Sequence, residues 1–218
     1  MVGITKNRFF RGLYSFYKKY SLRNSQMGFC AENVVLDYPI VVSGPQNMYL
    51  YENTIIYGGA MILCDRAKFV MKKNSGAARD LKVICGNHAH VVGKWFIGIT
   101  EADKDTMLNV KNLDKDIVVE EDVWLGANVT LLSGVTIGRG ASIGCGTVCR
   151  YDVPPYAVVM GNPAKVVRFN FTPAQIIEHE KVLYPENERL SLDLLESNYR
   201  TFYLDRVDEI RKYKQLHG

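Results

Sequence analysis

The sequence predicts a mainly β protein built as a parallel β-helix, in which each repeat supplies one short strand and its turn. The main observation is a period of six residues, which neither a helix of 3.6 residues per turn nor a two-residue strand alternation produces. Aliphatic side chains fill the first place of each repeat: Val119, Leu125, Leu131, Ile137 and Ile143. Small or aliphatic residues fill the fifth place: Val123, Val129, Val135, Ala141 and Thr147.

The same register occurs earlier in the chain, in two shorter runs. These are Leu50, Ile56 and Ile62, then Met71, Ala77 and Val83. The breaks between runs indicate either loops at a corner or looser early coils. Three hexads close one triangular coil of about 18 residues, and stacked coils lie about 4.8 Å apart, as neighbouring strands do. We therefore expect the β-helix to span residues 27 to about 168.

The composition, 47% hydrophobic and 23% charged, is that of an ordinary globular chain. Its 218 residues fit one domain with or without an appendage. No apolar run approaches the roughly 20 residues that span a bilayer. The N-terminus lacks the features of a signal peptide, so we expect a cytoplasmic protein. The five cysteines are scattered without a Cys-x-x-Cys pair, and we predict that they stay reduced and that the protein has no metal site.

Residues 1–26 are predicted to form a basic helical arm. Residues 1–31 contain six lysines and arginines and no acidic residue, with aromatic side chains between them. Such a helix can lie on an anionic membrane or approach an acidic polymer. It can also pack its aromatic side on the open end of the β-helix, which needs a cap. Nucleic-acid binding is not expected, because no recognised binding module accompanies the basic residues.

Two further segments leave the six-residue register. An inserted loop covers residues 89–116 or thereabouts, and its length favours a functional role. A helical tail covers residues 169–218. Thr172 and Pro173 form a typical helix start, Pro185 ends that short helix, and a longer helix is expected from about Arg189 to Leu216.

Three stretches in this order carry a resemblance to a known family. Residues 118–129 resemble a coil of the left-handed β-helix acetyltransferases, and residues 152–168 resemble their closing segment. Residues 86–88 (Gly-Asn-His) match the place where the xenobiotic and sugar acetyltransferase branches carry a catalytic histidine. The resemblance covers roughly residues 50 to 185. It implies a left-handed β-helix, acetyl-CoA as the acyl donor and no bound metal ion.

The resemblance assigns His88 as the general base. A neutral imidazole can take the proton of an acceptor hydroxyl while the oxygen attacks the thioester carbon. Residue spacing alone does not separate His88 from His90, which can point to the same side of an extended chain. A histidine directly after Gly-Asn is the pattern that favours His88. Asn87 can orient the base or the acceptor, or simply form a turn.

The resemblance also places coenzyme A along the late coils. The small residues expected to accommodate the pantetheine arm are Gly126, Ala127, Gly144, Cys145 and Gly146. The basic residues expected to meet the phosphates are Arg150, Lys165 and Arg168. Simple repeat geometry also explains the glycines. Many relatives have Thr-Lys where this chain has Cys149-Arg150, which puts that phosphate contact in doubt. Trp124 should face outward, toward the acceptor and coenzyme A or toward another subunit.

Several acceptors and two other functions are compatible with these residues. Residues 93–96 (Gly-Lys-Trp-Phe) replace the Tyr-Pro-Phe-like turn of xenobiotic acetyltransferases, which favours a carbohydrate hydroxyl over a drug. A drug hydroxyl or an amino sugar is the alternative acceptor. A γ-type carbonic anhydrase needs three histidines around zinc, and the required spacing is absent. A non-enzymatic assembly scaffold is the remaining alternative. The resemblance further implies a homotrimer whose substrates meet between adjacent β-helices.

Overall fold

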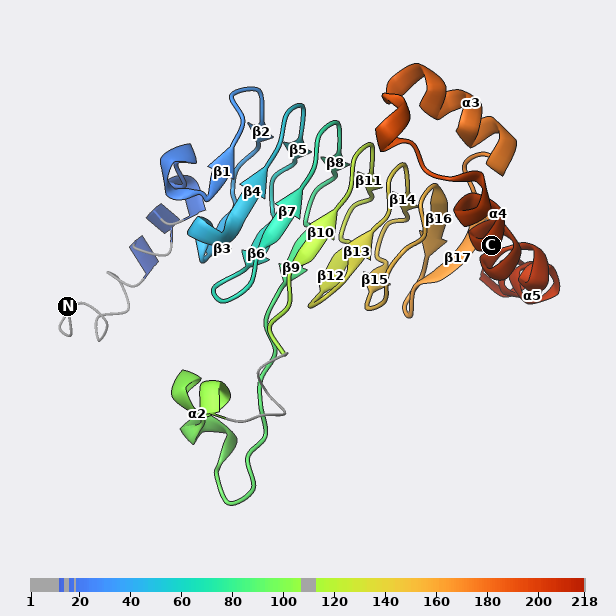
Figure 1. Ribbon diagram of the computed structural model, residues 1–218. Coiled ribbons are helices and arrows are strands. Elements are labelled where there is room, and N and C mark those ends of the chain that lie inside the picture. Colours follow the sequence, from blue (N-terminus) through green and yellow to red (C-terminus); the bar gives the residue numbers. More distant parts are fainter. Residues whose placement is uncertain (1–11, 14–15, 18, 107–112, 218) are drawn as a thin grey trace.

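The structure is a computed structural model that describes residues 12–13, 16–17, 19–106 and 113–217. In these ranges the chain winds into a left-handed β-helix, as predicted (Figure 1). The first sheet contains β1 (Phe29–Cys30), β4 (Met48–Leu50), β7 (Phe69–Met71), β10 (Ile117–Val119) and β13 (Thr136–Ile137). The second sheet contains β2 (Val35–Leu36), β5 (Ile55–Ile56), β8 (Gly76–Ala77), β11 (Trp124–Leu125), β14 (Ser142–Ile143), β16 (Ala157–Met160) and β17 (Lys165–Phe169). The third sheet contains β3 (Val41–Ser43), β6 (Met61–Leu63), β9 (Lys82–Ile84), β12 (Thr130–Leu132) and β15 (Val148–Cys149).

The chain visits the three sheets in turn, so three consecutive strands make one coil. We call the turns from the first to the second sheet the first corner, those from the second to the third sheet the second corner, and those leading back to the first sheet the third corner. Neighbouring strands pair in parallel, except that β17 runs antiparallel to β16 and ends the stack.

The predicted hexad pattern is confirmed by burial. The first-place side chains from Leu50 to Ile143 are at most 1% exposed, and the fifth-place residues are at most 2% exposed. The inward column forms one hydrophobic core, which makes hydrophobic burial the main stabilising contribution of the repeat. The breaks in register arise at the third corner, where the chain inserts extra residues between β6 and β7 and between β9 and β10.

Left-handed backbone conformations recur at the first corner in successive coils from Asn53 onward. Asn53, Asn74 and Asp122 have φ of 57°, 62° and 57° there, which asparagine and aspartate tolerate better than other side chains. Tyr156 has a φ of 60° at the same corner although its side chain is bulky. The Asn53 side chain donates to Asn74 Oδ1 at 2.9 Å, which links successive coils along this corner.

The inserted loop leaves the stack after β9 and projects away from it (Figure 1). It contains the short helices η4 (Phe96–Gly98) and α2 (Glu101–Thr106), and returns to the stack at β10. We call residues 85–106 and 113–116 the loop arm. Its side chains include three strongly exposed apolar ones, Val92 at 103%, Trp95 at 87% and Ile97 at 92%.

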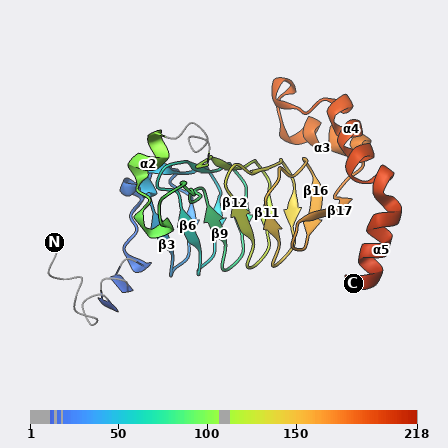
Figure 2. The same ribbon diagram turned by 90° about the horizontal axis from the view of Figure 1, so that it is seen from below.

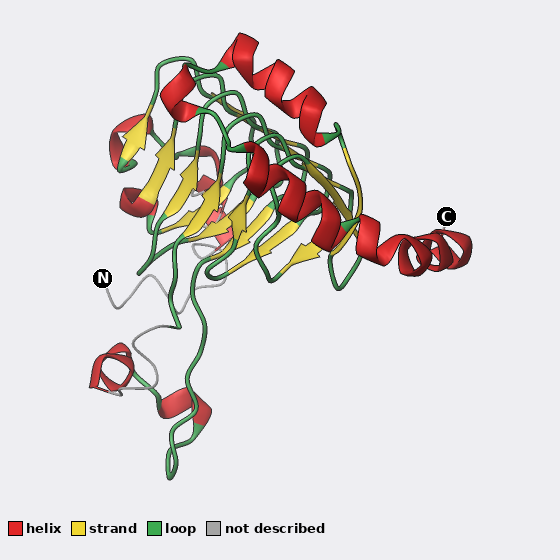
Figure 3. Ribbon diagram, turned by 45° about the vertical axis from the view of Figure 1, so that its right-hand side comes forward, coloured by secondary structure: helices red, strands yellow, loops and turns green. Residues whose placement is uncertain are grey.

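The C-terminal helices gather at the end of the stack that β16 and β17 form (Figure 3). Helix α3 (Pro173–Leu183) begins at the predicted cap, where Thr172 Oγ1 accepts from the Gln175 N–H, and it ends before Pro185. The short η5 (Glu186–Glu188) leads to α4 (Leu192–Phe202). The prediction of one helix from Arg189 to Leu216 is wrong: η6 (Leu204–Arg206) separates α4 from α5 (Val207–His217).

The break lies at Tyr203, which has a non-helical backbone with φ −128° and ψ −62°. Tyr199 packs on Phe169 of β17 at 5.3 Å and on Tyr203 at 5.2 Å between ring centroids. These aromatic contacts bind the end of α4 to the closing strand, and the chain turns there so that α5 can dock on β17. The sequence around Tyr203 contains no proline or glycine that could have indicated the break.

Most of the predicted N-terminal arm lies outside the described residues. Phe16 and Tyr17, which are helical, are 61% and 60% exposed. Tyr20 stacks on Tyr38 of the first coil at 6.3 Å. The N-terminal segment and the C-terminal helices lie at opposite ends of the stack (Figure 2). None of the helices that the structure describes is long and apolar enough to cross a membrane.

Candidate active site

His88 lies at the base of the loop arm, where the chain leaves the third corner of the coil that ends with β9. Its side chain is exposed, whereas Ala89 beside it is 3% exposed and anchors the backbone. The His88 ring meets the Phe96 ring edge-on, with centroids 5.1 Å apart and planes at 71°. In the part of the chain that the structure describes, neither imidazole nitrogen of His88 has a hydrogen-bond partner, so both are available to a substrate.

His90 shares this environment with His88. Its ring centroid lies 6.0 Å from that of Phe96, and its side chain is exposed too. Both histidine rings therefore lie beside the same phenylalanine. Geometry alone leaves both as candidate bases.

Asn87 is used to close the base of the loop arm. Its backbone N–H donates to Asp114 Oδ1 at 2.9 Å, and its side-chain amide donates to the Leu113 carbonyl at 3.1 Å. The Lys115 N–H donates to the Cys85 carbonyl and to Ser133 Oγ, at 3.1 and 2.9 Å. These bonds join the segment that enters the loop arm to the segment that returns from it. Asn87 therefore orients the peptide before His88 rather than pointing freely into a substrate site.

Trp124 faces outward from the second sheet, as predicted, and is 49% exposed. It pairs with Gly76 in β8, and a methyl group at Gly76 would lie 3.0 Å from Cζ3 of the indole. The absence of a side chain at Gly76 thus leaves room for the indole ring. The exposed face of the indole is available to a ligand or another subunit.

The small residues assigned to coenzyme A lie at the second corner in two successive coils. Gly126 and Ala127 follow β11, and Gly144, Cys145 and Gly146 follow β14. A methyl group at Gly126 would lie 2.8 Å from the Cys145 backbone N, so coil stacking by itself requires this glycine. At Gly146 a methyl group would meet nothing within 4 Å, but the left-handed backbone, with a φ of 71°, favours glycine. Cys145 and Gly146 are exposed and leave a smooth surface.

The three predicted phosphate ligands come from two segments near the closing end of the stack. Arg150 is exposed at the third corner after β15, with its guanidinium 5.6 Å from the Tyr151 ring centroid. Lys165 and Arg168 lie on β17 in the second sheet. Arg168 donates to the Phe169 carbonyl and to Asn170 Oδ1, both at 3.3 Å.

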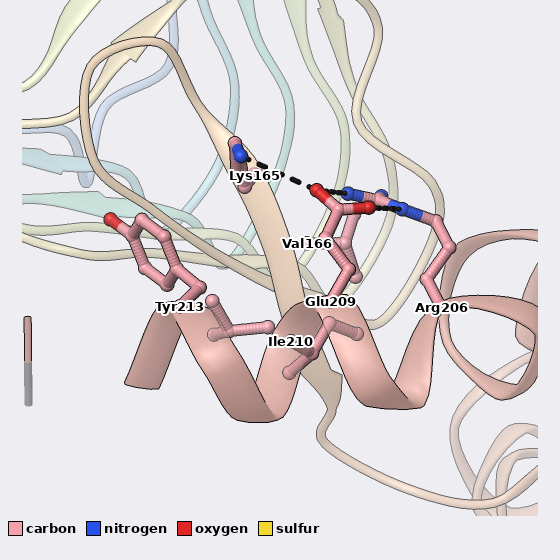
Figure 4. A pocket seen from close by; sticks show the side chains of 7 residues that line it. Lys165, Val166, Arg206, Glu209, Ile210 and Tyr213 are labelled. Carbon is pink, nitrogen blue, oxygen red and sulfur yellow. Dashed lines mark hydrogen bonds and ion pairs between the residues drawn. The ribbon is translucent and has the colours of Figure 1, made fainter. Parts of the chain in front are cut away.

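Lys165 is already paired with helix α5. Its Nζ lies 3.3 Å from Glu209 Oε1, and Arg206 donates to both Glu209 oxygens at 3.0 Å (Figure 4). The bonds from Arg206 and Lys165 lower the pKa of Glu209 to about 2. The same Lys165 and Arg206 line a cavity of about 260 Å³ between the closing segment and Phe202.

Within one chain, the predicted base and the predicted coenzyme A surface therefore lie on different corners of the β-helix. His88 belongs to the third corner, and the small residues belong to the second corner. Sequence reasoning missed two residues that shape the surroundings of His88, namely Arg66 and Asp114. Periodicity carries no signal for them, because they act from a corner turn and from the loop arm. No group of three or more histidine, cysteine or acidic side chains in the described ranges is arranged to hold a metal ion.

Comparison with known proteins adds to this geometry. Residues 116–150 match the bacterial transferase hexapeptide family, described by six repeats. A Saccharomyces cerevisiae protein named "Putative acetyltransferase YJL218W" is 27% identical over 151 residues, which cover 69% of this chain and 70% of that protein. A chloramphenicol acetyltransferase of Agrobacterium fabrum is 46% identical over 56 residues, 26% of this chain and 27% of its own.

Solved structures share the fold. A hexapeptide-repeat acetyltransferase from Vibrio cholerae, complexed with acetyl coenzyme A, superposes with a TM-score of 0.57 at 22% identity and covers 72% of this chain and 84% of its own. A maltose O-acetyltransferase from Clostridium difficile gives a TM-score of 0.56 at 19% identity, with coverages of 78% and 89%.

Residues 116–150 thus carry the bacterial transferase hexapeptide repeat. Over about two thirds of its length or more, the chain is similar to acetyltransferases in sequence and in fold.

Proposed function

We propose that the protein transfers the acetyl group of acetyl-CoA to a hydroxyl of a carbohydrate, with His88 as general base. The observation that carries this proposal is the placement of His88, an exposed imidazole without a polar partner in the described residues, on a backbone fixed at the base of the loop arm. The solved relatives support the donor and the acceptor class, because they include an acetyltransferase complexed with acetyl coenzyme A and a maltose O-acetyltransferase.

In the proposed reaction, His88 accepts the proton of the acceptor hydroxyl while its oxygen attacks the thioester carbonyl carbon. A backbone N–H of an adjacent coil stabilises the resulting oxyanion. The carbon–sulfur bond then breaks, and the imidazolium of His88 returns its proton to the leaving thiolate. General base catalysis of this kind contributes about 10² to 10⁴-fold to the rate. No protein nucleophile is required, because the thioester is already activated.

The separation of the two surfaces supports a shared site in a homotrimer. His88 and the second-corner glycines of one chain lie on different corners, and a site between two copies would bring the His88 of one copy to the glycines of another. The loop arm carries Val92, Trp95 and Ile97, each at least 87% exposed, and such an apolar surface favours contact with another subunit. Trp124 of one copy would then lie near the acceptor bound at His88 of another.

The donor surface is proposed to run along Gly126, Ala127, Gly144, Cys145 and Gly146. Its phosphate end would use Lys165 at the cavity beside Phe202, with Arg150 or Arg168 as additional cations. Lysine and arginine donate strong charge-assisted hydrogen bonds to phosphate oxygens. Glu209 must release Lys165 before a phosphate can take its place.

A drug hydroxyl is the second candidate acceptor. The similarity to the chloramphenicol acetyltransferase of A. fabrum favours a drug acceptor, but that similarity covers only 56 residues. The Gly-Lys-Trp-Phe sequence at residues 93–96 still favours a carbohydrate. An amino sugar, acetylated on nitrogen, is a third possibility within the same chemistry.

The N-terminal arm is proposed to contact an anionic membrane surface. The described part exposes Leu13, Phe16 and Tyr17 instead of packing them on the coil. With six cations and no acid in residues 1–31, the segment is complementary to anionic lipid. Sedimentation with phosphatidylglycerol vesicles should retain the protein, and equal recovery with neutral vesicles would contradict the electrostatic role.

The reaction is tested by mass spectrometry of a panel of sugars, amino sugars and antibiotics incubated with acetyl-CoA. We expect one acetyl group to be added to a sugar, and His88→Ala to lower turnover at least 10²-fold. His90→Ala is the matched control, because His90 contacts the same Phe96 ring. A His88→Ala variant with full activity would overturn the assignment, and full loss in His90→Ala alone would transfer the role to His90.

A further inference from the structure

Asp114, at the returning end of the loop arm, uses its two carboxylate oxygens for different purposes. Oδ1 accepts the backbone N–H of Asn87 at 2.9 Å. Oδ2 lies 3.1 Å from Nε of Arg66 and 3.8 Å from Nζ of Lys104. The carboxylate side chain is 11% exposed and that of Lys104 is 10% exposed, so these charges are largely shielded from water. Coulombic attraction is therefore screened less than at an open surface.

Arg66 connects the loop arm to the neighbouring coil. It lies in the third-corner turn between β6 and β7, and it bonds Glu101 at 2.8 Å and also Asp105, both on α2. Its third partner is Asp114. One guanidinium thus fixes the helix of the arm and the carboxylate at its base against the same corner, using the planar array of donors that arginine offers.

The bond from Asp114 acts directly on the backbone before His88. Asn87 is the residue that precedes His88, and its side chain also bonds the Leu113 carbonyl. Gly86 allows the approach, because a methyl group there would lie 3.1 Å from Asp114 Oδ1. Asp114 fixes the backbone next to His88, and Phe96 contacts the His88 ring.

We infer that Asp114, held by Arg66, is a positioning residue that sets the orientation of His88 for proton abstraction. This inference rests on the proposed function, since it concerns the same site. Asp114 does not touch substrate; it acts through the Asn87 peptide. A misplacement of about 1 Å at a reacting group can lower a rate about 10²-fold, so a backbone anchor of this kind is expected to affect kcat.

The test compares Asp114→Ala, Asp114→Asn and Arg66→Lys with His88→Ala. Asp114→Ala should lower kcat about 10 to 100-fold while KM for acetyl-CoA changes less than about threefold. Asp114→Asn keeps an oxygen acceptor for the Asn87 N–H and should recover part of the loss. Arg66→Lys retains the charge but cannot bond three carboxylates in the same geometry. Its kcat should lie between those of the wild type and Asp114→Ala.

A double-mutant cycle separates positioning from general destabilisation. In the His88→Ala background, Asp114→Ala should have little further effect on kcat, because no base remains to be positioned. Additive losses would overturn the inference. Asp103→Asn is the matched control: this carboxylate bonds only Lys94 and Thr100 within the arm, so kcat should stay within about twofold of wild type.

Two results distinguish failure of the inference from failure of the proposed function. If His88→Ala is inactive but Asp114→Ala turns over like wild type, Asp114 is not a positioning residue although His88 remains the base. If His88→Ala is fully active, the proposed function fails. The backbone bond itself is checked independently by hydrogen exchange of the Asn87 amide, which should be faster in Asp114→Ala; an unchanged rate would contradict the anchor.

Discussion

The guanidinium of Arg139 lies 3.3 Å from the carboxylate of Glu180, whose side chain is 0% exposed. Arg139 belongs to the first corner of the coil that contains β13 and β14, and Glu180 belongs to α3. The Tyr156 hydroxyl donates to the same Glu180 oxygen at 3.0 Å, and the Leu190 N–H donates to the other at 2.6 Å. A buried carboxylate satisfied in this way ties the C-terminal helices to the β-helix. Burial, and then the adjacent Glu180 charge, raise the pKa of Tyr156, so its hydroxyl stays protonated as the donor.

Arg139→Ala should destabilise the protein by about 3 kcal/mol, because it leaves Glu180 buried without its cation. Glu180→Gln should cost less, about 1 kcal/mol, since the amide oxygen still accepts hydrogen bonds. Urea unfolding measures both values. Arg211→Ala is the control, because its pair with Asp208 is exposed, and no measurable loss is expected. Equal stability of Arg139→Ala and wild type would contradict a stabilising role of this ion pair.

Gly76→Val should displace the Trp124 indole, because even a single methyl group would lie 3.0 Å from its ring. The chain has two tryptophans, so the emission of Trp124 can be followed alone in a Trp95→Phe background. We expect a shifted emission maximum together with a rise in KM of several-fold. Gly12→Ala serves as the control, since a methyl group there meets nothing within 4 Å. An unshifted spectrum would show that the indole does not depend on Gly76.

The docking of α5 on β17 should weaken in acid. The pKa of Glu209 is about 2, below its usual value of 4.5, owing to its bonds to Arg206 and Lys165. A carboxylate with a lowered pKa in the folded state stabilises that state above its unfolded pKa. The contribution is lost as pH falls from about 4.5 through about 2. A carboxyl NMR titration of Glu209 should show this low midpoint, shifting upward in high salt, whereas a midpoint near 4.5 would exclude the ion pairs in solution.

Glu209→Gln should strengthen coenzyme A binding if Lys165 contacts a phosphate. Removing the competing carboxylate frees an ammonium group. Because an exposed ion pair of this kind contributes little, the gain in affinity should be no more than about fivefold. Lys165→Ala should weaken binding in the same calorimetric titration. Asp193→Asn, on α4, is the control for a change of one negative charge in the tail. If Lys165→Ala binds coenzyme A like wild type, Lys165 is not a phosphate ligand.

Replacing Val92, Trp95 and Ile97 together by serine should dissociate the proposed trimer and lower activity. Burial of these apolar side chains against another subunit would favour assembly by about 25 cal/mol per Å². Light scattering should show a trimer for the wild type and a smaller species for the variant. A control that replaces Val182, 83% exposed on α3, by serine should leave the mass unchanged. A wild-type monomer at micromolar concentration would contradict the shared site.

The sequence by itself determined the repeat architecture and the ends of α3. A side chain such as Leu125 must face inward at every sixth residue, and this periodicity is visible without coordinates because it is local and regular. The cap at Thr172 and the stop at Pro185 are local as well. The role of asparagine and aspartate in the left-handed turns was not predicted, although Asn74 and Asp122 repeat at one corner.

Tertiary structure decided how distant residues meet. The break at Tyr203 depends on aromatic contacts with β17, and no helix-breaking residue in the sequence indicates it. The anchor from Arg66 to Asp114 joins residues 48 positions apart, and the Arg139–Glu180 pair joins residues 41 apart. Such contacts depend on how the loop arm and the tail fold back on the coils, which no periodic pattern encodes. The sequence therefore predicted the β-helix and the candidate base His88. Only the fold showed that Asp114 and Arg66 anchor the backbone beside His88, and that His88 and the second-corner glycines lie on different corners.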